Sequence, residues 1–249
     1  GGPVTFKDIP FNDQGTQALL LNREGGELTT IPEGGPEKHQ INRVCNGILA
    51  DDCSYQFTSE VTTSGDTAME FRLKYVNRNE DYTTLTLEKE LASSWTGARI
   101  EAPRFLNLKE ISEPVRYSCR TTLDQWARQI EEIILFRIPW IGSMQTAGLI
   151  NVQKRNSALQ TPSPIRFTDS HRIQIPSEFS GYGLPYEHHF ECKWGRYQAT
   201  VRVEDSLLIC ERQVDHLGGI VFQDEYPAFK EYWESCTRAD ALDIVLMKH

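Results

Sequence analysis

The residues best suited to metal chemistry are His188, His189 and Cys192, which lie together in the segment YEHHFECKW. Imidazole and thiolate groups are typical zinc ligands. If the segment is a strand, neighbouring side chains point to opposite faces, so His189 shares a face with Glu187 and Glu191 while His188 shares the other with Cys192. Neither face alone supplies three good ligands. We therefore interpret the pair as solvated strand residues and expect neither a metal nor a cofactor.

Nucleophilic catalysis would need a thiolate beside a histidine. By spacing alone, Cys192, Cys210 or Cys236 could pair with His171 or His216. No cysteine lies at a glycine-rich turn or at the start of a predicted helix, where its pKa would fall. The sequence therefore predicts no catalytic residue, and we expect that the chain is not an enzyme.

The six cysteines form no CxxC pair, which argues against a zinc ribbon. Cys45 and Cys53 could face each other across a hairpin that turns at 49–51, and a disulfide would then be possible in an oxidising compartment. The alternative is that all six are buried thiols that pack as small hydrophobic side chains. The sequence leaves the choice for Cys45 and Cys53 open.

Two other patterns suggest binding functions. Trp140, Tyr182, Tyr186, Trp194 and Tyr197 lie at or near predicted turns, where flat rings could stack on a glycan, although large aromatic residues more often pack β-cores. The stretch TSEVTTSGDT at 58–67 alternates like the insertion hairpin of a β-pore-forming toxin, but neither of its faces is apolar enough for lipid.

Composition limits the partners. Acidic residues outnumber basic residues by 35 to 26 in the 249-residue chain, giving a formal charge of −9. Nucleic acids and anionic membranes both require clustered Lys and Arg, so neither is expected as a partner. The most apolar run, Ile133–Phe136, is far shorter than the roughly 20 residues of a membrane helix, so no transmembrane segment is expected.

These residues are positioned by a β-rich α+β fold, predicted as two antiparallel sheet or sandwich subdomains with a few helices. Pro and Gly crowd the segment 32–36 and mark a boundary. We expect a linker and β-hairpin over 1–35, a first β-rich domain over 36–155, and a β-meander closed by a helix and strand over 156–249. Strands are expected at 39–49, 54–63, 100–106, 114–122, 128–138, 166–175, 187–194, 197–204, 207–213, 219–222 and 243–247.

Helices are expected at about 80–95 and 226–238. In the second, Tyr226, Phe229, Trp233 and Cys236 recur on one helical face. The segment 66–78 is ambiguous: alternation of apolar residues from Met69 to Tyr75 favours a strand, whereas the spacing of Ala68, Phe71 and Tyr75 also fits a helix.

Three segments carry a resemblance to a known family. The opening QGTQALLLNREGGELTTIP, the segment GDTAMEFR at 65–72 and the ending YPAFKEYW…ADALDIVLMKH resemble the C-terminal portion of transglutaminase-like proteins from the envelope of Bacteroidetes. In that family a β-rich region of unknown function follows a papain-like core. GDTAMEFR is similar to a motif that begins a helix, and this resemblance favours a helix over 66–78.

The resemblance implies that a Cys-His-Asp core, if any, would lie upstream of Gly1 in a longer protein. The chain would then be a non-catalytic accessory domain, periplasmic or on the cell surface, with that upstream domain as its partner. Leu19, Leu21 and Ile31 of the first hairpin would contact it. An envelope protein or a glycan could be a further partner, so a glycan-binding or adhesion module is the first alternative and a pore-forming protein the second.

Overall fold

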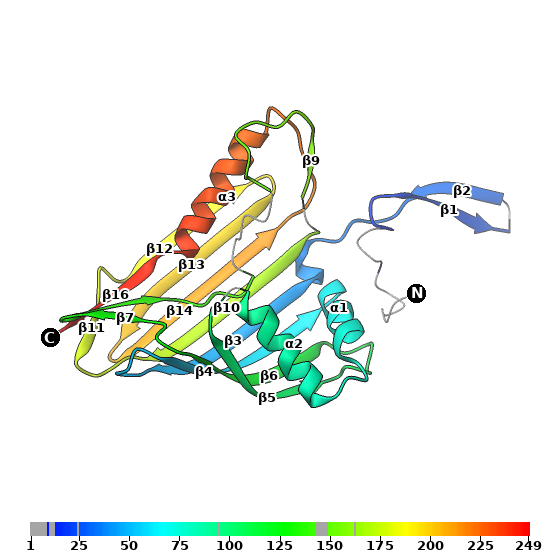
Figure 1. The fold of residues 1–249 in the computed structure, drawn as a ribbon. Coiled ribbons are helices and arrows are strands. Elements are labelled where there is room, and N and C mark those ends of the chain that lie inside the picture. Colours follow the sequence, from blue (N-terminus) through cyan, green and yellow to red (C-terminus); the bar gives the residue numbers. More distant parts are fainter. Residues whose placement is uncertain (1–8, 10–12, 24, 94, 143–148, 162) are drawn as a thin grey trace.

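The computed structural model describes residues 9, 13–23, 25–93, 95–142, 149–161 and 163–249. Its main feature is an eight-stranded sheet in the order β12-β13-β14-β10-β3-β4-β6-β5 (Figure 1). In chain order the strands are β3 (Gln40–Leu49), β4 (Tyr55–Ser64), β5 (Ala98–Leu106), β6 (Val115–Leu123), β10 (Ile165–Gln174), β12 (Tyr186–Cys192), β13 (Gly195–Glu204) and β14 (Leu207–His216).

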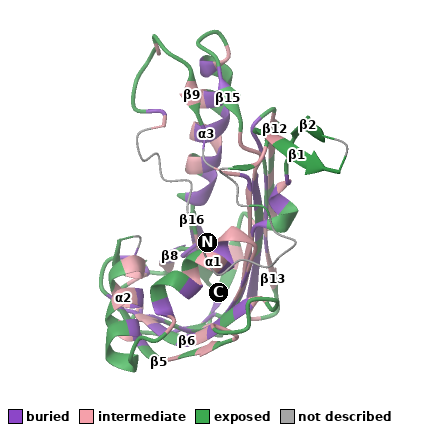
Figure 2. Ribbon diagram, turned by 90° about the vertical axis from the view of Figure 1, so that its right-hand side faces the viewer, coloured by how far each residue is buried: buried purple, intermediate pink, exposed green. Residues whose placement is uncertain are grey.

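The large sheet buries one face and leaves the other to solvent. Along β4, for example, Phe57 and Val61 are buried while Thr58 and Glu60 are exposed. This period of two is expected of strands with one solvated face. The sheet curves, and the three described α-helices and a second sheet all lie on its concave side (Figure 2). The concave side therefore contains the core.

The second sheet has four strands in the order β11-β16-β8-β7. Its inner side chains, among them Phe136 and Leu246, join the core cluster that includes Tyr55 of the large sheet. We predicted one strand over 128–138, but the chain reverses at Glu131, whose φ is +53°. The sequence analysis also predicted no strand at Phe179–Tyr182, which forms an edge strand of this sheet. The four strands are β7 (Arg128–Ile130), β8 (Ile133–Arg137), β11 (Phe179–Tyr182) and β16 (Asp243–Lys248).

Two helices, α1 (Asp66–Tyr75) and α2 (Glu80–Ala92), cover one end of the large sheet beside β4, β5 and β6. Both helix predictions are confirmed. Burial of Ala68 and Tyr75, with Leu73 exposed, follows the helical spacing rather than the strand-like alternation. Asn79 caps α2, because its Oδ1 accepts a hydrogen bond of 2.9 Å from the Tyr82 backbone N–H.

The third helix, α3 (Tyr226–Asp240), covers the other end of the large sheet beside β12. Phe229, Trp233 and Cys236 are buried in one cluster with β13 and β14 side chains, as the apolar face predicted. Pro227 lies in the first turn, where a missing N–H costs nothing. The predictions of this helix and of the closing strand β16 are confirmed.

A β-hairpin of β1 (Gln17–Asn22) and β2 (Gly25–Thr30) projects from the body (Figure 1). Most of the linker predicted over 1–13 lies outside the described residues. The remaining short elements are a 3-10 helix, η2 (Pro36–Lys38), and a two-stranded sheet of β9 (Leu159–Gln160) and β15 (Ile220–Val221).

Hydrogen bonds cross the domain boundary expected at 155/156. Strands β3 and β10 lie on opposite sides of it and pair in parallel, from Gln40 beside Arg166 to Ile48 beside Gln174. The other neighbouring strands of this sheet are antiparallel. The β-rich α+β fold with several antiparallel sheets is confirmed, but two domains separated here would have to share one sheet.

The structure also bears on two segments singled out in the sequence. The stretch 58–67 forms the C-terminal part of β4 and the start of α1, and it is not a hairpin of its own. Strand β4 lies between β3 and β6 in the large sheet. Cys45 and Cys53 do not face each other, because Cys45 lies opposite Ser59 and Cys53 lies in the turn; both are free thiols. None of the described helices is long and apolar enough to cross a membrane.

Candidate functional site

The centre of the concave face holds a cluster of buried charges: Arg43 on β3, Asp169 on β10, Arg212 on β14 and Asp240 on α3. Asp169 accepts hydrogen bonds from Arg43 Nε at 2.7 Å and Arg212 Nη2 at 2.8 Å. Arg212 Nη1 donates to Asp240 Oδ2 at 2.6 Å, and the Tyr197 hydroxyl donates to Asp240 Oδ1 at 2.8 Å. Two cations and two anions leave the cluster neutral overall.

The same charges hold the segment that leaves β8. Arg43 donates to the Pro139 carbonyl at 2.5 Å, Arg212 donates to the Ile141 carbonyl, and the Ile141 N–H donates to Asp169 at 3.2 Å. Each buried ion is therefore engaged by partners within the protein, as buried charges require. We interpret the cluster as a structural connection between β3, β10, β14 and α3.

The arginines stay charged in this setting. Burial alone lowers the pKa of Arg43, but Asp169, together with Cys45 and Tyr117, outweighs burial, so the pKa is raised. Burial also lowers the pKa of Arg212, but the nearby Asp240 and Asp169 together outweigh burial, and this pKa is raised as well. Groups that are always charged and always paired cannot serve as acids or bases.

Spacing alone allowed His171 or His216 to pair with a cysteine, and the structure places His171 beside two cysteines. His171 lies between Cys45 and Cys210 on adjacent strands, and all three side chains are fully buried. Burial, reinforced by Arg43 and Arg212, holds the pKa of His171 well below its usual range. Burial also raises the pKa of Cys45 to about 12 and that of Cys210 higher still. These thiols are protonated and inert at neutral pH.

Spacing also allowed His216 to pair with Cys236, but the ring of His216 packs on a different side chain. The His216 ring stacks on Trp233 at a centroid distance of 5.1 Å. Burial lowers the pKa of His216 to about 4 and raises that of Cys236 to about 12. Burial also raises the pKa of the half-buried Cys192. Neither Cys236 nor Cys192 therefore has the lowered pKa that a nucleophilic thiol requires.

His188 and His189 lie on β12, an edge strand of the large sheet, and point to opposite faces. His188 is half-buried and stacks with Phe190 at 5.9 Å, whereas His189 is exposed. Within the described part of the chain, no three His, Cys, Asp or Glu side chains converge to hold a metal ion.

The five aromatic residues suggested for glycan stacking do not form one surface. Trp140, Trp194 and Tyr197 are buried in the core, because their rings fill the space between the large sheet and the elements that cover it. Tyr186 is half-buried and packs against the same core. Only Tyr182 of these five, with 65% of its surface exposed, remains available to a ligand.

The residues suggested for contact with another domain lie on the projecting hairpin. Leu19 and Leu21 are 59% and 74% exposed, and Ile31 is half-buried. Leu19 lies opposite Leu28, which is 67% exposed, so these leucines share one face of the hairpin. The described residues leave this apolar face uncovered.

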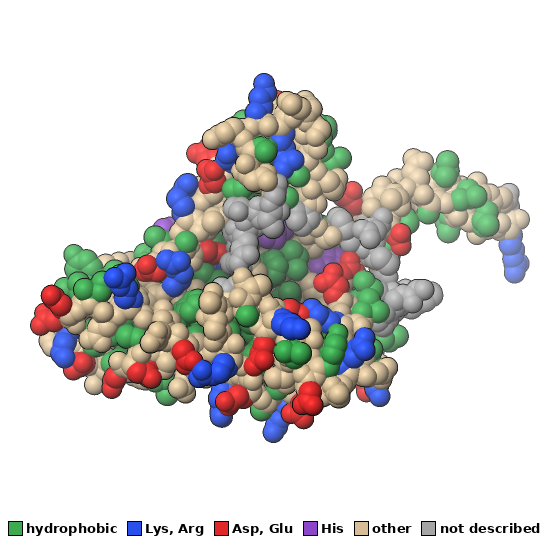
Figure 3. Space-filling model, in the orientation of Figure 1, with side chains coloured by type: hydrophobic (Ala, Val, Ile, Leu, Met, Phe, Trp, Pro, Cys, Tyr) green, Lys and Arg blue, Asp and Glu red, His purple; other side chains and the backbone are tan. Residues whose placement is uncertain are grey.

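The visible surface has no patch of one charge. Figure 3 shows Lys and Arg interspersed with Asp and Glu over this side of the molecule. Hydrophobic and histidine side chains gather in a hollow between the upper end, which carries α3, and the lower body (Figure 3). A mixed surface of this kind lacks the basic stripe that nucleic-acid binding needs.

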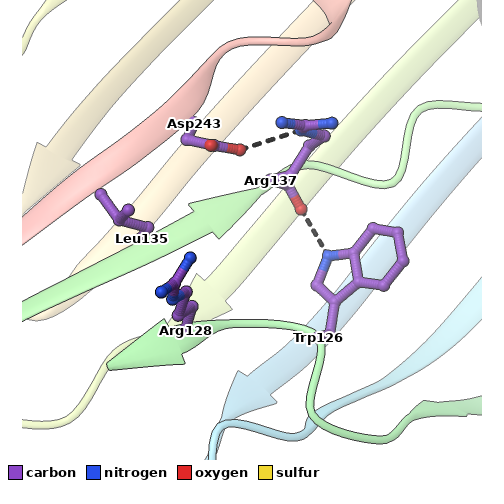
Figure 4. Close-up of a pocket in the computed structure, with 5 residues that line it drawn as sticks. All are labelled: Trp126, Arg128, Leu135, Arg137 and Asp243. Carbon is purple, nitrogen blue, oxygen red and sulfur yellow. Dashed lines mark hydrogen bonds and ion pairs between the residues drawn. The ribbon is translucent and has the colours of Figure 1, made fainter. Parts of the chain in front are cut away.

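Sequence reasoning missed a shallow pocket of about 290 Å³ on the second sheet. Arg137 donates to Asp243 at 2.9 Å, and the Trp126 indole donates to the Arg137 carbonyl at 2.5 Å (Figure 4). The alternation of Ile133, Leu135 and Arg137 indicated that these side chains share one face of a strand. With 128–138 taken as one straight strand, however, Arg128 falls on the opposite face, and the reversal at Glu131 brings it to the same one. The pocket is lined by Trp126, Arg128, Leu135, Arg137 and Asp243.

Residues 132–246 match a family described as a domain of unknown function with a solved structure (DUF3858). No curated protein matches the chain. A crystal structure described as a "putative protease" from Parabacteroides distasonis is similar at 14% sequence identity and a TM-score of 0.42, over 47% of this chain and 24% of that one. Similarity at this level carries no conclusion about this chain's activity.

Proposed function

We propose that this chain is a non-catalytic accessory domain of a transglutaminase-like protein of the bacterial cell envelope. In this proposal it binds a neighbouring domain of the same protein through the β1–β2 hairpin. The link to transglutaminase-like proteins and the periplasmic or surface location come from the sequence resemblance. The match over 132–246 to a domain of unknown function is compatible with both.

The observation that carries the proposal is the apolar face of the hairpin. A two-stranded hairpin is marginally stable in water on its own and needs a partner surface. Leu19, Leu21 and Leu28 are each more than half exposed. Covering a leucine contributes about 1.5–3 kcal/mol, so burial of all three would give several kcal/mol towards binding. An exposed apolar surface of this kind is typical of an interaction site.

The state of the thiols supports the non-catalytic part of the proposal. Cys45, Cys210 and Cys236 are fully buried, with pKa values raised by burial. A cysteine nucleophile needs the opposite, an accessible thiol with a lowered pKa.

Binding to the neighbouring domain tests the proposal. The domain encoded immediately upstream would be produced separately and titrated with this chain in a calorimeter. We expect a dissociation constant near or below about 1 µM, which corresponds to roughly −8 kcal/mol. Leu19→Asp should weaken binding at least about tenfold, because it places a charge in the apolar contact.

Leu106→Asp is the matched control, because Leu106 is a strand leucine with a similar exposed fraction, 61%, on β5. It should leave the affinity unchanged. Absence of binding, or equal losses from both substitutions, would overturn the proposal.

A further inference from the structure

The second sheet has an outer face that faces away from the core and is largely apolar. Ile133 and Leu135 of β8 point outward, in alternation with the buried Ile134 and Phe136. Across the strands, three rows of register partners form this face: Arg128–Leu135–Val245–Tyr182, Ile130–Ile133–Met247–Ser180 and Arg137–Asp243.

A single cation stands at the end of the first row. Arg128 is exposed on β7, and its guanidinium points across towards the β8 side chains (Figure 4). Arg137 and Asp243 pair with each other. Within the described part of the chain, Arg128 is therefore the one charge lining the pocket that lacks an ion-pair partner.

The shape and charge of the pocket restrict what it can hold. Its volume of about 290 Å³ is at the lower end of the range of small-molecule sites, roughly 300–1,000 Å³, so it suits one or two side chains better than a cofactor. Arg128, Arg137 and Asp243 together leave one net positive charge, which matches one carboxylate. A phosphate or a polyanion would need more cations, and the chain as a whole carries −9.

The apolar lining specifies the rest of the ligand. The Trp126 indole N–H is already engaged by the Arg137 carbonyl, so the ring offers apolar surface rather than a hydrogen bond. Leu135 is the cross-strand neighbour of Arg128. A carboxylate bound by Arg128 would therefore lie beside the apolar side chains of Leu135 and Trp126.

We propose that this surface binds an extended segment of a partner protein that presents one Asp or Glu between apolar residues. The carboxylate pairs with Arg128, and the apolar neighbours cover Leu135 and Trp126. This site lies on a different sheet from the β1–β2 hairpin and does not depend on the function proposed for the hairpin.

The probe is the peptide acetyl-Thr-Ile-Glu-Ile-Thr-amide, with a Glu→Gln peptide as its counterpart. Binding to the full chain is followed by the ¹H–¹⁵N signal of the Trp126 indole, assigned by its loss in Trp126→Phe. We expect a dissociation constant of about 0.1–1 mM, as suits one shallow contact. The Gln peptide should bind at least about fivefold more weakly, and raising the salt concentration should weaken the Glu peptide.

Two arginine variants provide the protein side of the test. Arg128→Gln should lower the affinity for the Glu peptide at least about fivefold, while Arg128→Lys should retain most of it. Arg116→Gln is the matched control, because Arg116 is an exposed strand arginine on β6 in the large sheet, and it should change nothing. Unaltered thermal unfolding of each variant shows that the fold is intact.

Two outcomes would overturn the inference. Equal binding of the Glu and Gln peptides, or undiminished binding to Arg128→Gln, would show that Arg128 does not recognise a carboxylate here. Butyrate distinguishes the source of the carboxylate: if it binds as tightly as the peptide, the site takes a free small acid and the partner segment is refuted.

Discussion

Replacing Asp169 by Asn should destabilise the protein far more than the same substitution at the surface. Asp169 accepts hydrogen bonds from Arg43 at 2.7 Å and from Arg212 at 2.8 Å, and its side chain is 0% exposed. Asn is nearly isosteric but carries no charge. The variant would leave two buried guanidinium groups with Asp240 as the remaining carboxylate of the cluster.

The magnitude can be worked out in two ways. Each hydrogen bond to a charged group contributes about 1.5–3 kcal/mol, which gives roughly 3–6 kcal/mol for two. Removing one partner of a buried ion pair costs about 3–5 kcal/mol. Both values are a large fraction of the roughly 5–15 kcal/mol by which most domains are stable. At about 2–4 °C per kcal/mol for a chain of this size, Tm should fall by at least about 6 °C.

The assay is urea unfolding followed by circular dichroism, with Asp243→Asn as the matched control. Asp243 accepts a hydrogen bond from Arg137 at 2.9 Å, but the two side chains are 40% and 49% exposed. An exposed pair contributes about 0–1 kcal/mol. If Asp169→Asn loses no more stability than Asp243→Asn, the cluster is not the structural connection that we infer.

Two further predictions concern titration and reactivity. His216, with a folded-state pKa of about 4, binds its proton more weakly when folded than when unfolded. Its contribution to stability is therefore complete above pH ~6.5 and declines as the pH falls towards 4, and His216→Phe should reduce the loss in urea midpoint between pH 7 and pH 5. Under native conditions at pH 8, a thiol reagent should modify the partly exposed Cys53 well before Cys45 or Cys236; rapid labelling of all six thiols would contradict the burial described here.

The local elements could be predicted from the sequence because their signals lie within a few residues. The apolar face of α3 and the alternation in β4 each depend on a single segment. The segment of α1 was harder, since its apolar residues fit two periods, and only the resemblance favoured the helix. The reversal within 128–138 was missed because Glu131 adopts a positive φ without a glycine to indicate it.

The charged cluster could not be assembled from the sequence, because its members are brought together by pairing between distant strands. One signal was nevertheless available. Arg43 and Arg212 each occupy an inward position of a strand whose other inward residues are mostly apolar, and Asp169 does so on β10. A charged residue at an inward-facing position of a strand predicts a buried partner of opposite charge, although it does not identify that partner.

The parallel pairing of β3 with β10 delays part of the folding until late in synthesis of the chain. Arg43 and Asp169 are separated by 126 residues, so the emerging polypeptide must be extended that far before the guanidinium meets its carboxylate. Until then β3 can pair with β4, while its other edge stays open and could bind the wrong strand. We expect the order of synthesis to leave this open edge as the point where a nascent chain most needs protection from aggregation.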